Sequence, residues 1–217
     1  MSRSTLERLA PLTGIVFVAL LVISFIVGGE SPDADESTED VVAFWTEDDS
    51  AQIASAIIGA WAAVFLVWFG ATVAAAVRRA EIEAGRLASI AFGGFLLIAV
   101  GGLSFSAFQF AAADTAGDVP AEVTQTLSVL FADFFFPLAG GTFLALLSVG
   151  IATLRHGVLP RWLGYAAIVI AIAALTPVGF FAFLAAGIWV LAVSVVLYSS
   201  GTAPSTQPPA PRFSEQP

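Results

Sequence analysis

Long apolar stretches, separated by short polar segments, divide the first 200 residues of the chain. A membrane-spanning helix needs about 20 mainly apolar residues, with a range of about 17–25. Five stretches meet or exceed that length, namely residues 11–29, 52–77, 87–113, 131–154 and 178–198. A sixth stretch, residues 162–176, is shorter. The pattern therefore predicts an all-α fold, an integral membrane bundle of six transmembrane helices within residues 1–200.

The last two stretches could form either one long helix or a hairpin. As a single helix, residues 162–198 would measure roughly 55 Å, far more than a hydrocarbon core of about 30 Å. Pro177 disfavours a helical conformation at Thr176, the residue before it, and Gly179 follows closely. The sequence thus predicts a tight helical hairpin that turns near Pro177.

All basic residues of the chain are arginines, and their positions predict its orientation. Short cytoplasmic loops of membrane proteins carry an excess of Lys and Arg. If the N-terminus is inside, the six-helix topology places every arginine in a cytoplasmic segment, and the reversed topology places every one outside. The arginines are Arg3, Arg8, Arg78, Arg79, Arg86, Arg155, Arg161 and Arg212. We therefore expect a multi-pass protein of the plasma membrane with cytoplasmic N- and C-termini.

The composition excludes several kinds of membrane enzyme. Only 12% of the residues are charged, against about 25% in a typical soluble domain. The chain has no Lys for a retinal or pyridoxal Schiff base, and no Cys for a thiolate nucleophile or an iron–sulfur ligand. Its single histidine, His156, cannot supply a bis-histidine haem site. We expect no cofactor, no metal ion and no enzymatic activity.

Two segments outside the apolar stretches have distinct compositions. Residues 30–50 carry many acidic residues and no basic one, which is typical of a solvated exterior surface but could also attract cations or a basic partner. Within this loop, the apolar patch from Val41 to Trp45 predicts a short interfacial helix capped by Ser37 or Thr38. Residues 201–217 are rich in Pro, Ser and Thr and are expected to form a disordered cytoplasmic tail.

Asp133 is the one acidic residue inside a predicted apolar segment. A carboxylate at the bilayer centre costs about 2.5–3.5 kcal/mol, so a functional site is the default hypothesis. Pro137 cannot donate to the Asp133 carbonyl four residues earlier, which is expected to leave that oxygen free. Gln109 is expected at a similar depth, and the three groups could bind a proton, a small cation or a substrate amine. The alternative is a structural hydrogen bond near the outer interface.

The small and polar residues of the other apolar segments are expected to serve packing. Pro137, Gly140 and Gly141 together could form a hinge. Ser55 and Gly59 predict close approach of a neighbouring helix, because small residues let helix backbones meet in lipid. Ser106 is expected to hydrogen-bond to its own helix backbone.

Three short segments carry a resemblance to a known family. They are residues 42–45, residues 131–141, and residues 159–164 with a later Trp189. In this order they resemble DUF4386-type membrane proteins of actinobacteria, over residues 8–200. The resemblance implies a multi-pass helical fold and carries no residue roles.

Two functions remain open at the level of sequence. The leading hypothesis is a non-enzymatic bundle that acts as a scaffold or partner subunit. The alternative is a small proton- or cation-coupled transporter or channel that uses Asp133. The expected partners are the lipid bilayer and either further copies of the chain or another membrane protein, and no nucleic acid. An intramembrane enzyme ranks last, because the chain offers no candidate nucleophile, metal site or base.

Overall fold

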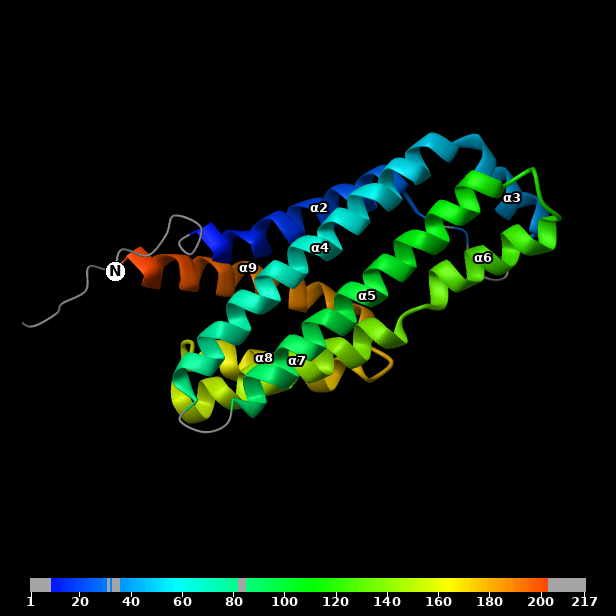
Figure 1. Cartoon of the computed structure of the whole chain (residues 1–217). Coiled ribbons are helices and arrows are strands. Elements are labelled where there is room, and N and C mark those ends of the chain that lie inside the picture. The colour runs from blue at the N-terminus through cyan, green and yellow to red at the C-terminus, as the bar shows by residue number, and fades with distance from the viewer. Residues whose placement is uncertain (1–8, 31, 33–35, 82–84, 203–217) are drawn as a thin grey trace, which may run out of the picture.

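In the computed structural model, shown in Figure 1, residues 9–30, 32, 36–81 and 85–202 are described. Within that part of the chain there is no β-strand. The helices are η1 (Ala10–Leu12), α2 (Thr13–Gly28), α3 (Thr38–Glu47), α4 (Asp49–Ala80), α5 (Arg86–Thr115), α6 (Ala121–Asp133), α7 (Phe136–His156), α8 (Arg161–Ala174) and α9 (Gly179–Thr202). The predicted disordered tail, residues 201–217, lies almost wholly outside the described residues.

Five helical segments are long and apolar enough to cross a membrane. They are Ala10–Gly28, Asp49–Ala80, Arg86–Thr115, Ala121–His156 and Gly179–Ser200. The remaining apolar helix, α8, has 14 residues. At 1.5 Å per residue it measures about 21 Å, short of a core of about 30 Å. The all-α membrane bundle is confirmed, with five full-length spans and one shorter helix where six spans were expected.

The helices α8 and α9 form an antiparallel hairpin. The turn between them, residues 175–178, contains Pro177. The indole Nε1 of Trp189, in the middle of α9, donates a hydrogen bond to the Leu163 carbonyl near the start of α8, at 3.0 Å. This bond satisfies the one polar atom of a buried indole and fixes the register of the two helices.

Two glycines let α5 and α7 approach each other closely. A Cβ atom on Gly141 would lie 2.7 Å from the Ile98 backbone nitrogen and 2.8 Å from the Gly94 carbonyl oxygen. A Cβ on Gly94 would in turn lie 2.8 Å from the Gly141 carbonyl oxygen. The two backbones therefore touch, and only glycine fits at these positions. Gly140 and Gly141 both lie inside α7, and the chain interrupts its helix earlier, at Phe134 and Phe135.

The two ends of the bundle differ in charge and in packing. The arginines that the structure describes lie where α4 and α7 end and α5 and α8 begin (Figure 1). At the opposite end, α3 and α6 pack beside the start of α4 and the end of α5, around the buried side chains of Val41, Trp45 and Phe131. The predicted short helix at Val41–Trp45 is part of α3. Ser37 is its N-cap, since its Oγ accepts from the Asp40 N–H at 3.2 Å.

Candidate ligand-binding site

A buried polar network joins α2, α4 and α5. Ser24 and Ser55 exchange hydrogen bonds, the Ser24 Oγ donating to the Ser55 carbonyl at 3.0 Å and the Ser55 Oγ to the Ser24 carbonyl at 2.9 Å. Gln109 Nε2 donates to Gln52 Oε1 at 2.9 Å and to Ser55 Oγ at 3.0 Å. Gln52 Nε2 donates to the Gly28 carbonyl at 2.6 Å. The network thus satisfies a carbonyl in the last turn of α2 that has no partner within its own helix.

Helical spacing explains why these side chains meet. Gln52, Ser55 and Gly59 are three and four residues apart, so they share one face of α4, and Ser106 and Gln109 share one face of α5 in the same way. Gly28 lets the end of α2 approach that face, because a Cβ atom there would lie 2.7 Å from the Ser55 Oγ. Close packing of small residues and hydrogen bonding between amides therefore act at the same level of the bundle.

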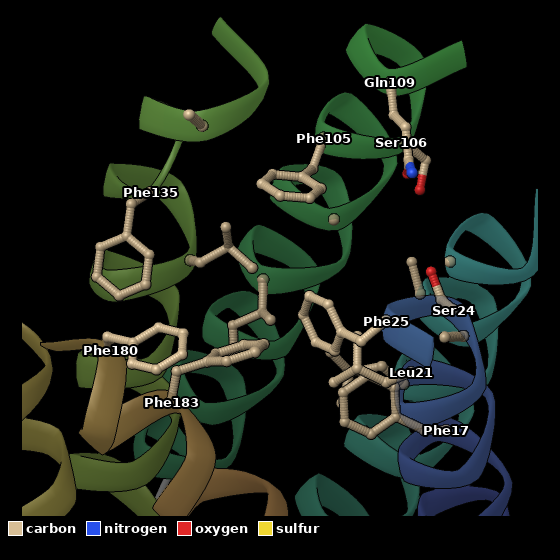
Figure 2. A pocket seen from close by; sticks show the side chains of 18 residues that line it. Phe17, Leu21, Ser24, Phe25, Phe105, Ser106, Gln109, Phe135, Phe180 and Phe183 are labelled. Carbon is tan, nitrogen blue, oxygen red and sulfur yellow. The ribbon is translucent and has the colours of Figure 1, made fainter. Parts of the chain in front are cut away.

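A cavity of about 210 Å³ lies next to this network, between α2, α4, α5 and α9. On a further side it is bordered by the end of α6, the break that follows it and the start of α7, which contribute Ala132, Phe135 and Leu138. Figure 2 shows phenylalanine side chains from several helices around it. These are Phe17, Phe25, Phe105, Phe135, Phe180 and Phe183. None of the described residues that line the cavity is ionisable.

The divergence of α2 and α9 opens this space. The two helices touch at Gly14 and Ser194, at the end of the bundle where the arginines lie. Toward the other end they separate, so that Phe25 and Phe180 lie on different sides of the cavity (Figure 2). A second cavity of about 30 Å³ lies closer to the point of contact and shares Phe17, Leu66 and other lining residues with the first. The two cavities are therefore neighbours with a shared wall.

One end of the larger cavity is polar, and two polar groups there have no partner. Ser106 is only 6% exposed, yet it makes no hydrogen bond to any residue in the described part of the chain. Gln109 uses Nε2 for its two hydrogen bonds, and no described group donates to its Oε1. A Cβ atom on Gly59 would lie 2.9 Å from the Ser106 Oγ and 3.3 Å from the Ser24 Oγ. Because Gly59 has no side chain, space remains between the hydroxyl groups of Ser106 and Ser24.

The structure does not bring Asp133 and Gln109 together. Asp133 is exposed at the end of α6 and does not line the cavity, although its neighbour Ala132 does. Its carbonyl oxygen accepts a hydrogen bond from the Phe135 N–H at 2.7 Å, so the expectation of a free carbonyl is wrong. The reason is that the helix breaks before Pro137, which lies in the first turn of α7, where no N–H is needed.

Several residues of the site were not singled out from the sequence as functional. The apolar pattern does not predict a role for Ser24 or Gln52, and it assigns Ser55 to packing. It predicts that Ser106 bonds to its own helix, which Ser106 does not do. The sequence does carry one indication of the polar network, which is the presence of a glutamine in each of two apolar helices, Gln52 and Gln109. An amide in lipid must find a partner, so two of them at one depth predict a contact.

Comparisons with protein-family profiles, with curated proteins and with solved structures found no match to this chain. The chemistry of the site must therefore be inferred from its geometry. Among the described residues, no group of three or more His, Asp or Glu side chains is placed to hold a metal ion. The arrangement is instead that of an apolar pocket with a few convergent polar groups, which is typical of small-molecule binding sites.

Proposed function

We propose that the protein is a non-enzymatic partner subunit of the plasma membrane that binds a small apolar molecule in the cavity between α2 and α9. The observation that carries the proposal is a preformed cavity of about 210 Å³ with an aromatic wall and one polar end. Cytoplasmic termini are part of the proposal, supported by the gathering of the described arginines at one end of the bundle. Membership of the DUF4386-type family is also part of it, and rests on the three sequence segments alone.

The size of the cavity supports a ligand with a single ring. An apolar cavity of about 150 Å³ is large enough for benzene, whereas sites for drug-sized ligands measure about 300–1,000 Å³. The cavity is open on one side, where Phe25 is 50% and Phe180 is 61% exposed. A small apolar molecule can therefore enter it from the bilayer.

Filling the cavity is expected to abolish binding. Gly102 lines the cavity, and a Cβ atom there would meet only the Ala63 Cβ, at 3.5 Å. Gly102→Leu should therefore fold and occupy the space. The test is photolabelling in lipid nanodiscs with 3-trifluoromethyl-3-phenyldiazirine, a small apolar probe, mapped by mass spectrometry. We expect saturable labelling of cavity residues, reduced at least tenfold in Gly102→Leu.

The matched control is Gly93→Leu on the same helix, since a Cβ atom on Gly93 meets nothing within 4 Å. Its cavity labelling should equal that of the wild-type protein. Labelling of Trp68, which is 65% exposed, should rise without saturation because this side chain faces lipid. Cavity labelling that does not saturate, or that survives in Gly102→Leu, contradicts the proposed function.

Proton- or cation-coupled transport is the second candidate, since Asp133 directly follows Ala132 of the cavity wall. Asp133→Asn removes the carboxylate and preserves the size of the side chain. If the protein only binds an apolar molecule, this variant should label like the wild-type protein, and neither should show pH-dependent ion flux in proteoliposomes. A pH-dependent flux that Asp133→Asn abolishes would favour the transport function.

A further inference from the structure

We infer that the cavity binds a neutral compound with one aromatic ring and one hydroxyl group, an alkylphenol in its simplest form. This inference rests on the proposed function, because it identifies the class of molecule that the proposed cavity would take. In this arrangement the ring lies among the phenylalanines and the hydroxyl group reaches Ser106 and Gln109. An alkyl substituent opposite the hydroxyl points toward the smaller cavity.

The unpartnered polar groups define the hydrogen bonds that a ligand must make. Ser106 can donate one hydrogen bond, and Gln109 Oε1 can only accept. A hydroxyl group complements both, because it donates its own proton to Gln109 Oε1 and accepts the proton of Ser106. A ketone or ether oxygen could accept from Ser106 but would leave Gln109 Oε1 without a donor. A hydrocarbon would leave both groups unsatisfied in an apolar surrounding. Figure 2 shows the polar ends of both side chains directed from α5 toward Ser24.

The lack of ionisable residues in the lining selects a neutral ligand. A carboxylate or an ammonium group in this cavity would lose its hydration and would find no opposite charge among the described lining residues. Fatty acids and protonated amines are therefore disfavoured, although they share the apolar part of the proposed ligand. An uncharged phenol keeps its proton at neutral pH and enters without that penalty.

The lining and the shape of the space select a ring with a short substituent. Aromatic rings pack edge-to-face or offset against phenylalanine, an arrangement that a saturated chain cannot reproduce. Phe17 and Phe183 line both cavities, so a short substituent directed toward these two side chains would lie on the side of the larger space, of about 210 Å³, that adjoins the smaller one of about 30 Å³. The smaller space admits only a few carbon atoms.

Competition against the photolabel tests this ligand class. The competitors are 4-butylphenol, butylbenzene and 4-butylbenzoate, each compared at equal concentration in the membrane after its partitioning into protein-free nanodiscs has been measured. We expect 4-butylphenol to protect the cavity residues at a concentration at least tenfold lower than butylbenzene. The benzoate should give no protection.

Two serine variants test the role of the hydroxyl group. Ser106→Ala removes a group that makes no hydrogen bond in the described part of the chain, so it should fold normally and reduce the preference for the phenol three- to tenfold. Ser104→Ala, two residues away and outside the cavity lining, should leave the preference unchanged. Equal protection by phenol and butylbenzene, or an unchanged preference in Ser106→Ala, overturns the ligand class while the proposed function stands. Failure of the wild-type cavity to label saturably overturns both.

Discussion

Gly141→Val is expected to lower the free energy of unfolding by about 3 kcal/mol, the upper end of the usual cost of overpacking. The added Cβ alone would meet the Ile98 backbone nitrogen at 2.7 Å and the Gly94 carbonyl oxygen at 2.8 Å. Backbone atoms of a helix cannot move aside as the tip of a flexible side chain can. The helices α5 and α7 would have to separate, and their contact holds one wall of the cavity in place. Unfolding by SDS in mixed micelles, followed by circular dichroism, measures the change.

The neighbouring glycine provides the control. A Cβ atom on Gly140 would meet only the Leu97 Cδ2, at 3.8 Å, so Gly140→Val should change the stability by no more than about 0.5 kcal/mol. If both variants destabilised the protein equally, the cause would be lost flexibility of α7, as the hinge hypothesis requires, and not the packing of α5 against α7.

Gln109→Leu is expected to destabilise the protein by about 2 kcal/mol. It removes both hydrogen bonds of Nε2, at 2.9 Å and 3.0 Å, and leaves Gln52 Oε1 buried without a donor. Individual hydrogen bonds between membrane helices average only about 0.6 kcal/mol. Most of the effect therefore comes from the acceptor that is left unsatisfied. The same SDS titration measures it.

A double-mutant cycle with Gln52→Leu separates the two contributions. When Gln52 has been replaced by Leu, the Gln109→Leu change no longer leaves the Gln52 Oε1 without a donor. The double variant should therefore be more stable, by about 1 kcal/mol, than the sum of the two single effects predicts. Strict additivity would mean that the two glutamines do not interact, and the polar network would have to be abandoned.

The sequence predicts most of the apolar helices because the bilayer imposes a length on them. The positions of Arg78, Arg86, Arg155 and Arg161 at the ends of apolar stretches mark helix ends that the structure also shows. The prediction of a sixth span relies on the shortest stretch, residues 162–176, and α8 is about as short, with 14 residues. Leu175 and Thr176, at the end of that stretch, belong to the turn. Hydropathy cannot separate the last turn of a helix from an apolar loop.

The candidate site was less predictable because it depends on how the helices lie relative to one another. Asp133 is an isolated charge in an apolar stretch, but the role predicted for it requires a continuous helix through Pro137, and the break at Phe134 removes that premise. Ser106 can satisfy its hydroxyl within its own helix or reach across to another group, and the sequence does not decide between these. The cavity itself results from the divergence of α2 and α9, two helices that are far apart in the sequence.

The shortness of α8 has a consequence for the surrounding lipid. Its outward face carries Trp162, Tyr165, Val169 and Ile172, so this helix borders the bilayer directly. Lipids beside it meet about 21 Å of helix, against a typical core of about 30 Å, and such hydrophobic mismatch is relieved by local thinning of the bilayer. Thinning costs fractions of a kcal/mol per Å, which is enough to sort proteins between membranes. The protein should therefore concentrate in the thinner regions of a membrane of uneven thickness.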